Sequence, residues 1–305
     1  MNQTIIQVQN LVIAFGNFKA VNGISFEVSK GEIFGFLGAN GAGKTTTIRA
    51  LCGILNPTSG RVFVNGKDVT AATSVLKPHI GYMSQKFTLY PDLTVAENMD
   101  LAGSLYGLDR QTIRLKSAEV FAFIGLKNIP KTPVKHLSGG IKQMIALASS
   151  ILHDPELLFL DEPTAGTSPQ TRAAFWNLIR QLAAQGKTVF VTTHYMDEAE
   201  YCRRIVLMQR GRILALGTPA QLKERYFPVK PKELTFLVNK QRETAQKIKQ
   251  AKWGLVSVFG SRLRVYVSQP DDFDEFCRNS RDVFTCQDVP PSLDDVFLKA
   301  ISGVL

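Results

Sequence analysis

Hydrophobic and polar positions follow two alternating patterns along the first 222 residues of the chain. Short apolar runs rich in Val, Ile and Phe predict strands, and stretches with helical spacing separate them. Three of these runs, 32–38, 157–162 and 188–194, are apolar without alternation, as a sheet buried on both faces requires. Two earlier runs, 5–15 and 23–28, predict an antiparallel opening. Together the runs predict an α/β domain with an antiparallel subdomain and a helical lobe at about residues 93–150.

The pattern changes after residue 222. Residues 223–233 carry two prolines and several charges and predict a linker. Beyond it the pattern predicts six elements in the order βαββαβ, namely 233–238, 242–251, 255–259, 262–267, 271–278 and 283–289. This order indicates a ferredoxin-like α+β accessory domain within residues 223–305. A last helix follows, for which Ser292 is the candidate N-cap.

The composition of the chain predicts its number of domains and its cellular compartment. The chain has 305 residues, 45% of them apolar and 20% charged, which suffices for a sizeable core and suggests about two domains. It has no run of about 20 apolar residues, so we expect no membrane span. Its N-terminus lacks the basic start and apolar core of a signal peptide, so we expect a soluble, cytoplasmic protein. Its four cysteines form no CxxC pair and are expected to be free thiols.

Charge widens the range of possible partners. The net charge of +10 permits an anionic partner such as a nucleic acid or a lipid surface. Much of the excess lies in residues 223–252, where nine Lys or Arg stand against three Glu. A solvated face accounts for the same excess, because charge balance is a weak indicator of function.

The run "GANGAGKTT" carries the strongest indication of chemistry. It fits the phosphate-loop pattern G-x-x-x-x-G-K-[ST] between a buried strand and a helix. Glycines let successive N–H groups point at phosphate oxygens, and the helix N-terminus adds partial positive charge. Lys44 supplies charge to the β- and γ-phosphates, and the Thr45 hydroxyl can coordinate Mg²⁺. The candidate nucleotide-binding residues are Gly38, Asn40, Gly41, Ala42, Gly43, Lys44, Thr45 and Thr46.

Two further motifs add to this loop. In "LLFLDE" an apolar strand ends in Asp161, which can hold Mg²⁺ through water, and Glu162, which can orient or deprotonate the attacking water. In "LSGGIKQ", Ser138, Gly139 and Gly140 open a helix, again an anion-binding arrangement. Because the first loop already satisfies the nucleotide, we infer that this second cradle serves a nucleotide bound on another copy. Two chains would then pack head to tail around two ATP molecules.

These three motifs, in this order, resemble the nucleotide-binding domain of ABC (ATP-binding-cassette) ATPases over residues 4–222. The resemblance implies a P-loop NTPase fold of the ABC type, with ATP and Mg²⁺ as ligands. It also implies that Ser138 and Gly140 reach the γ-phosphate across a dimer. One departure matters: Ser168 stands where the family usually has the aspartate that helps to link the two ATP sites, so coupling in a homodimer is less certain.

Three other positions match family landmarks. The resemblance implies that Phe15 stacks on adenine, although a core phenylalanine is the alternative. Gln85 resembles the glutamine that senses Mg²⁺ and the attacking water, which adds it to Thr45 and Asp161 as a metal-site candidate. His194 resembles the switch histidine that contacts the γ-phosphate, whereas a lone histidine is more often structural. Glu162, His194 and Gln85 are thus the candidate catalytic residues.

The segments "THYMDEAEYC" and "PSLDDVFL" resemble the ATPase subunits of ABC-2-type exporters, which include drug-resistance and daunorubicin-type systems. The resemblance implies an ATPase that powers export of drugs or other amphipathic small molecules. It would lie peripherally on the cytoplasmic face of a bacterial inner membrane, with ABC-2-type permease subunits and a second, identical or different, ATPase subunit as partners. Residues 90–106 are the candidate contact with the permease.

Two other functions compete with this one. A soluble ABC ATPase acting on nucleic acid or ribosomes would fit the positive charge. Such proteins usually carry two cassettes, long coiled coils or zinc modules, which this sequence lacks, so we expect no nucleic-acid partner. A non-catalytic regulatory cassette is disfavoured, because the four candidate residues Lys44, Asp161, Glu162 and His194 are all present.

Overall fold

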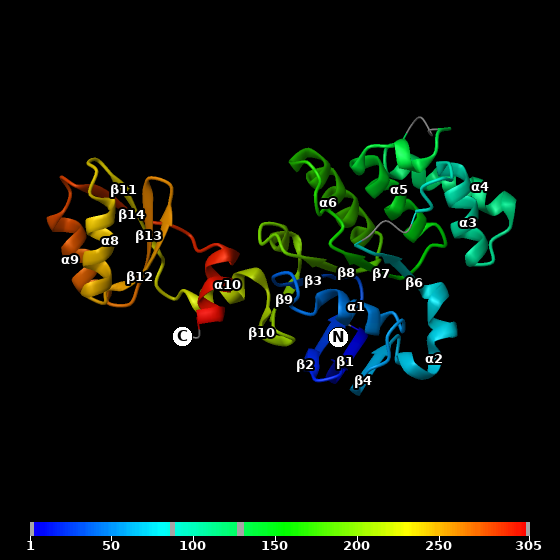
Figure 1. Ribbon diagram of the computed structural model, residues 1–305, viewed down its shortest axis with the longest axis horizontal. Coiled ribbons are helices and arrows are strands. Elements are labelled where there is room, and N and C mark those ends of the chain that lie inside the picture. Colours follow the sequence, from blue (N-terminus) through cyan, green and yellow to red (C-terminus); the bar gives the residue numbers. More distant parts are fainter. Residues whose placement is uncertain (1–2, 86–88, 127–130, 303–305) are drawn as a thin grey trace. The chain divides into compact units, whose positions relative to one another are not determined.

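The structure is a computed structural model that describes residues 3–85, 89–126 and 131–302. By its internal contacts the chain divides into two compact units, Met1–Pro219 and Ala220–Leu305. Figure 1 shows the elements of both units along the chain. The strand runs predicted from the sequence all form strands, as described below for each unit.

A six-stranded sheet runs through the first unit. Its order is β10-β9-β3-β8-β7-β6, with all neighbours parallel except the antiparallel pair β10 and β9. Every residue of β3, β7 and β8 is buried, which confirms the prediction of strands covered on both faces. The strands are β3 (Ile33–Leu37), β6 (Ile80–Met83), β7 (Leu157–Asp161), β8 (Thr188–Thr193), β9 (Arg204–Gln209) and β10 (Arg212–Gly217).

An antiparallel sheet of order β2-β1-β4-β5 forms the second layer, as the opening of the sequence predicts. Helix α1 (Lys44–Leu51) lies between the two sheets and contacts β2, β4 and β7. Five aromatic rings gather between these layers, with neighbouring ring centres 5.4–6.1 Å apart. The strands are β1 (Thr4–Phe15), β2 (Phe18–Ser29), β4 (Ser59–Val64) and β5 (Lys67–Asp68). The rings belong to Phe26, Phe34, Phe36, Phe159 and Phe190.

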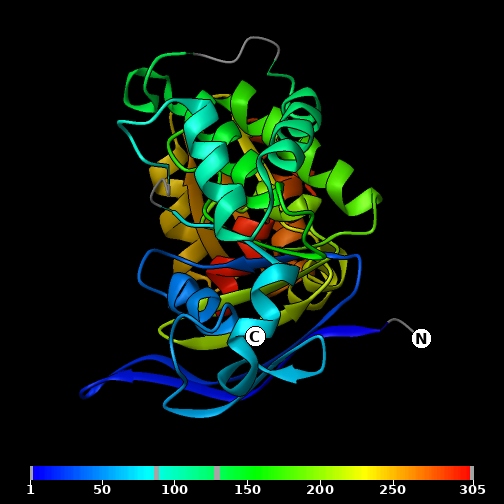
Figure 2. The same ribbon diagram turned by 90° about the vertical axis from the view of Figure 1, so that its right-hand side faces the viewer.

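Helices cover the remaining surfaces of the unit. Three of them pack on one another and form the predicted helical lobe: α3 (Val95–Leu105), α4 (Arg110–Phe123) and α5 (Gly139–Ile151). Within this unit, Figures 1 and 2 show the lobe on the side opposite the antiparallel sheet. Polar side chains set the helix starts, since Thr94 and Glu97 form a capping box at α3 and Asp109 caps α4.

Other short elements complete the first unit. Helix α6 packs on β8, and α2 packs on β4 and β5. No helix within the described ranges is long and apolar enough to cross a membrane. These elements are α2 (Val69–Leu76), α6 (Pro169–Ala184) and three 3-10 helices, η1 (Lys77–His79), η2 (Val134–His136) and η3 (Glu198–Tyr201).

The second unit has the predicted ferredoxin-like order. Four antiparallel strands pair in the order β12-β13-β11-β14, and the core side chains of α8 and α9 pack with those of the strands. Ser292 Oγ accepts from the backbone N–H of Asp295, so the predicted cap of the last helix is confirmed. The elements are β11 (Lys232–Phe236), α8 (Gln241–Gln250), β12 (Gly254–Phe259), β13 (Arg262–Val267), α9 (Pro270–Asn279), β14 (Phe284–Asp288) and α10 (Leu293–Ser302).

The predicted linker at 223–233 is wrong at both ends. Helix α7 (Pro219–Tyr226) covers its first residues, and β11 begins at Lys232. Tyr226 and Phe227 are buried, and the Lys299 ammonium donates to the Tyr226 carbonyl at 2.6 Å. Apolar burial therefore overrides the charged and proline-rich composition on which the linker prediction relied.

Candidate functional site

The loop between β3 and α1 has a backbone that only glycine accommodates at two positions. A Cβ on Gly38 would lie 2.3 Å from the Met208 carbonyl oxygen, and one on Gly43 would lie 2.4 Å from the Ala20 carbonyl oxygen. Gly43 also has a φ of 109°, in the region that side chains disfavour. The sequence pattern thus reflects a loop packed tightly against neighbouring backbone, with its last residue at the N-terminus of α1.

Lys44 turns back over this loop. Its ammonium donates to the carbonyl oxygens of Gly38 at 2.8 Å and Ala39 at 3.2 Å, and lies 3.0 Å from Glu162 Oε1. Both side chains of the ion pair are about 95% buried. A buried charge of this kind is tolerated only with a partner, and phosphate oxygens at the loop would compete with Glu162 for the same ammonium.

Asp161 is fully buried at the end of β7. Its Oδ1 accepts from the hydroxyls of Thr192 at 2.7 Å and Thr45 at 3.2 Å. Burial raises the pKa of Asp161, while these two hydrogen bonds oppose the rise. Thr192 is a site residue that the sequence reasoning missed; the run of two threonines before His194 was the available indication.

The second oxygen of Asp161 makes the residues here fit a divalent cation. Asp161 Oδ2 is buried and has no hydrogen-bond partner among the described residues. The Thr45 hydroxyl donates to the other oxygen of Asp161, and the Gln85 carboxamide donates to the adjacent Glu162. Both side chains carry oxygen atoms of the kind that Mg²⁺ prefers. Within the described ranges no three His, Cys, Asp or Glu side chains could hold a metal together, so water and phosphate would supply the other ligands.

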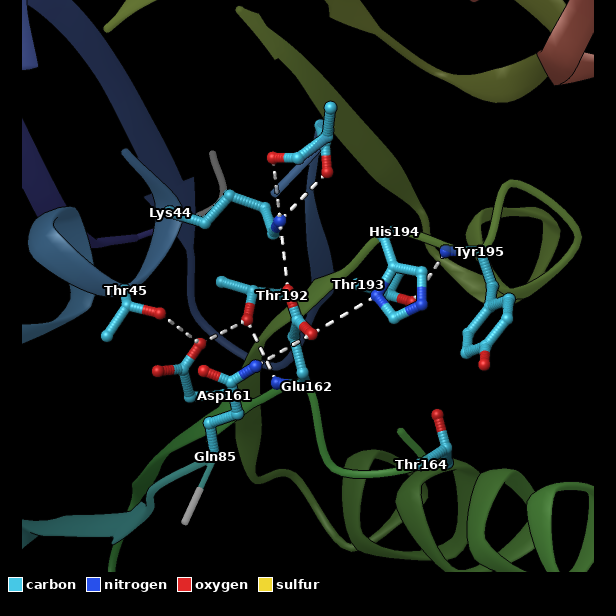
Figure 3. Close-up of polar contacts among 12 residues, drawn as sticks. Lys44, Thr45, Gln85, Asp161, Glu162, Thr164, Thr192, Thr193, His194 and Tyr195 are labelled. Atoms are coloured by element: carbon cyan, nitrogen blue, oxygen red, sulfur yellow. Dashed lines mark hydrogen bonds and ion pairs between the residues drawn. The ribbon is translucent and has the colours of Figure 1, made fainter. Parts of the chain in front are cut away.

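Glu162 is the point at which the predicted site residues converge, as Figure 3 shows. Its Oε2 accepts from the Gln85 carboxamide at 3.1 Å and lies 3.1 Å from His194 Nδ1. The residue has a φ of 48°, a strained conformation for a side chain of this size. Its backbone N–H donates to the Thr192 carbonyl at 3.1 Å and hydroxyl at 3.0 Å, which hold the strained turn in place. A carboxylate so placed can orient a water molecule and accept its proton.

A cavity of about 340 Å³ opens beside these groups. Phe15, which is 54% exposed, lines it, so the alternative of a core phenylalanine is wrong. Phe18, across the same β-turn, is 64% exposed and also lines the cavity; sequence reasoning did not single it out. Exposed aromatic rings beside a phosphate loop offer a stacking face for a base. The lining residues are Phe15, Phe18, Ala20, Asn40, Gly41, Gly43, Lys44, Thr45, Thr46, Gln85 and Glu162.

The "LSGGIKQ" residues lie elsewhere. They begin helix α5, where Ser138 is the N-cap and its hydroxyl accepts from the Ile141 N–H at 3.5 Å. Ser138 and Gly139 are exposed, and none of residues 138–140 is among the described residues that line the cavity. The structure therefore brings together the loop, Gln85, Asp161, Glu162 and His194, and leaves the start of α5 outside their site.

Comparison with known proteins places this arrangement in a family. A family model described as "ABC transporter" matches residues 21–165. The Nod factor export ATP-binding protein I of Rhizobium sp. strain N33 is 36% identical over 98% of this chain and 97% of its own length. This chain belongs to the ABC transporter ATP-binding proteins. The linearmycin resistance ATP-binding protein LnrL of Bacillus subtilis is 40% identical over 72% of the ABC chain and 71% of its own length.

Two other matches show how far the likeness extends. The probable multidrug ABC transporter ATP-binding protein YbhF of Escherichia coli is 47% identical over 72% of this ABC chain, which spans only 38% of that relative's length. Among solved structures, the ATP-binding subunit of an ABC transporter superposes with a TM-score of 0.66 at 27% identity, covering 73% of this chain and 93% of the other. The predicted ABC-type P-loop fold is thereby confirmed.

Proposed function

We propose that this chain is the ATP-hydrolysing subunit of an ABC-2-type exporter. The observation that carries the proposal is the convergence of Lys44, Gln85 and His194 on the single carboxylate of Glu162, beside a cavity lined by the phosphate loop. The names of the relatives, which concern drug resistance and export, support transport over the nucleic-acid alternative.

In this proposal each group around the cavity has one task. The loop N–H groups and the Lys44 ammonium bind the β- and γ-phosphates, and Phe15 stacks on adenine. Glu162 orients and deprotonates the attacking water, while Gln85 positions that water and His194 donates to the γ-phosphate. Thr45, Asp161 and Gln85 would hold Mg²⁺, which when bound neutralises charge that develops on the phosphate oxygens.

The exposed start of α5 completes the site of a second cassette. Ser138 and Gly140 offer N–H and hydroxyl donors at a helix N-terminus, and they lie outside the cavity of their own chain. Closure of two copies around ATP would bring these donors to the γ-phosphate and exclude water. Hydrolysis removes the group that distinguishes the closed from the open state, so the pair opens.

The membrane partner would bind the helical lobe. Tyr90 is 56% exposed and Leu105 is 76% exposed, and both line a groove of about 170 Å³ together with Tyr106. Exposed apolar side chains around a groove are typical of a protein contact. We place the chain peripherally on the cytoplasmic face of a bacterial inner membrane, bound there to ABC-2-type permease subunits that export drugs or other amphipathic small molecules.

Substitution of Gly139 tests the two-copy site separately from nucleotide binding. A Cβ on Gly139 would meet nothing within 4 Å, so G139D leaves its own chain undisturbed and adds a carboxylate where the partner's γ-phosphate would lie. In a slowly hydrolysing E162Q background we expect ATP binding to persist and ATP-dependent dimers, measured by analytical ultracentrifugation, to disappear. Equal dimer formation by E162Q and E162Q/G139D would refute the shared site.

The exporter assignment needs its own experiment. The chain carrying an affinity tag is purified from detergent-solubilised membranes, and the bound proteins are identified by mass spectrometry. We expect integral membrane proteins with the spans of an ABC-2 permease, and ATPase activity that changes when they are present. Recovery of ribosomal proteins or nucleic acid in their place would favour the soluble alternative.

A further inference from the structure

A second buried carboxylate lies behind the candidate site. Glu198, the first residue of η3, is 1% exposed, whereas the neighbouring Asp197 side chain is 72% exposed. Glu198 does not line the nucleotide cavity described above. Burial of a carboxylate costs free energy unless hydrogen bonds compensate for it. The hydrogen-bond partners of Glu198 therefore indicate its structural role.

Glu198 joins the two segments that carry Glu162 and His194. Its Oε1 accepts from the hydroxyl of Thr164, two residues after Glu162, at 2.5 Å. Its Oε2 accepts from the hydroxyl of Thr193, the residue before His194, also at 2.5 Å. Figure 3 shows Thr164 and Thr193 on the segments that follow Glu162 and precede His194.

The contacts of Glu198 with Thr164 and Thr193 form a bridge, and two further contacts hold the residues at its ends. The Thr193 hydroxyl oxygen also accepts from the Tyr195 N–H at 3.0 Å, so the backbone on both sides of His194 is held. The guanidinium of Arg172, from α6, lies 3.4 Å from Glu198 Oε1 and stacks 3.8 Å over the Tyr195 ring. Helix α6 begins at the Ser168 cap, in the segment that departs from the family pattern.

From these contacts we propose that Glu198 is a positioning residue for ATP hydrolysis, an inference that rests on the proposed function. The carboxylate sets the separation of the two segments, and thereby the 3.1 Å approach of His194 Nδ1 to Glu162 Oε2. Glu198 itself is not among the residues that line the nucleotide cavity. A shift of about 1 Å at a reacting group can lower a rate by about 100-fold, so loss of this bridge reduces kcat and leaves ATP affinity intact.

The test compares E198Q with E32Q in the full chain. Glu32 is a matched control, because it is 2% exposed and pairs with Arg204 at 2.6 Å in the same unit, and it does not line the cavity. We expect E198Q to lower kcat by about 10- to 100-fold with KM for ATP within about twofold, and E32Q to change neither. T164V, which removes only the hydroxyl that donates to Glu198 Oε1, provides a milder second variant and should show the same kcat-only loss.

A double-mutant cycle with H194A shows whether the effect passes through the histidine. If it does, E198Q costs little once His194 is absent. Independent, multiplying losses in the double variant, or equal losses in E32Q and E198Q, would overturn the positioning role. Absence of ATPase activity in the wild-type chain with its membrane partners would instead overturn the proposed function, so the two failures are distinguishable.

A separate observation in the second unit carries a second inference. Cys277 on α9 and Cys286 on β14 are free thiols whose sulfur atoms lie 3.0 Å apart. The hydrogen bond from Cys277, together with the charge of Lys232, lowers the pKa of Cys286. Both thiols line an open cavity of about 500 Å³, with Lys232, Asp274, Arg278 and Arg281 on its wall.

We infer that this pair is a site of reversible oxidation by hydrogen peroxide. The Cys286 thiolate attacks one peroxide oxygen, which gives a sulfenic acid and releases hydroxide that is protonated to water. The Cys277 sulfur then attacks the sulfenic sulfur, loses its proton and displaces a second water, which forms the disulfide. The peroxide is reduced by two electrons and the two thiols are oxidised by the same two.

Peptide mass spectrometry of the peroxide-treated full chain tests this inference. We expect a Cys277–Cys286 linked peptide that lacks two hydrogens and that dithiothreitol returns to two thiols. Cys202, which is 5% exposed, serves as the internal control and should stay reduced. C277S should instead stop at the sulfenic or sulfinic acid of Cys286. Unlinked thiols after treatment, or links between two chains only, would overturn the inference.

Discussion

Replacement of Glu162 by glutamine probes the ion pair at the centre of the site. In the structure the Lys44 ammonium lies 3.0 Å from Glu162 Oε1, and both side chains are buried. The amide of E162Q removes the negative partner and leaves Lys44 with the two loop carbonyls. The free chain should therefore lose stability, while the ATP-bound chain, whose phosphates pair with Lys44, should not.

The size of this effect follows from linkage. A hydrogen bond to a charged group contributes about 1.5–3 kcal/mol, and each 1.4 kcal/mol corresponds to a tenfold change in affinity. We thus expect E162Q to bind a non-hydrolysable ATP analogue roughly 10- to 100-fold more tightly than wild type. The substitution destabilises the free chain but not the bound chain, so the free energy of stability that the free chain loses is gained as binding free energy. Hydrolysis of ATP itself should fall by about 10²–10⁴-fold with the loss of the base.

Calorimetric titration with the analogue and thermal melts of the free chain measure the two sides of this balance. E32Q again serves as the control, since it breaks a buried ion pair away from the cavity and should lower stability without raising affinity. An E162Q chain that is less stable but binds the analogue no better than wild type would refute the competition between phosphate and Glu162 for Lys44.

The remaining predictions concern single groups or the whole second unit. K44A should lose most ATP binding in calorimetric titration, and wild-type affinity would contradict the loop assignment. D161N should abolish Mg²⁺-dependent ATP hydrolysis, because it removes a carboxylate that would hold the cation. D161N should also raise Tm at neutral pH. Burial raises the pKa of Asp161, so in the wild-type chain stability falls as pH rises from the unfolded-state pKa of Asp161 through its folded-state pKa. Asparagine does not ionise and avoids this loss. The difference in Tm between D161N and the wild-type chain should become smaller as pH falls below that range. A chain truncated after Pro219 should still melt cooperatively and bind ATP, whereas loss of folding would refute the two-domain division.

The parts of the site that the sequence predicted are those fixed by local backbone. A strand, a glycine loop and a helix start place Gly38, Gly43 and Lys44 by themselves, because their spacing is set within one turn. Asp161 and His194 were also predictable, since parallel buried strands end at one edge of their sheet. These local rules place the residues, but their pairing with Glu162 required the tertiary structure.

The residues that were missed depend on contacts between distant segments. Asp197, Glu198 and Glu200 follow His194 closely, and nothing in the sequence distinguishes the buried one from its neighbours. For Thr192 and Thr193 the run of two threonines before His194 is the available indication, but it does not show which carboxylate each hydroxyl contacts. Cys277 and Cys286 form no motif, and they meet only because α9 packs over β14. Sequence periodicity defines which elements form, but side-chain partners across the sheet are decided by packing.

The site gathers unfavourable features that the rest of the unit must offset. Asp161 is buried with one unpartnered oxygen, Glu162 has a strained backbone, and the Lys44–Glu162 pair is desolvated. The fully buried strands β3, β7 and β8 and their aromatic core supply the stability that holds this edge in place. Phosphate and a cation would satisfy the same lysine and aspartate, so ligand binding and stability are coupled at this edge. A chain whose nucleotide-dependent stabilisation survives D161N and K44A together would show that the strain serves some other purpose.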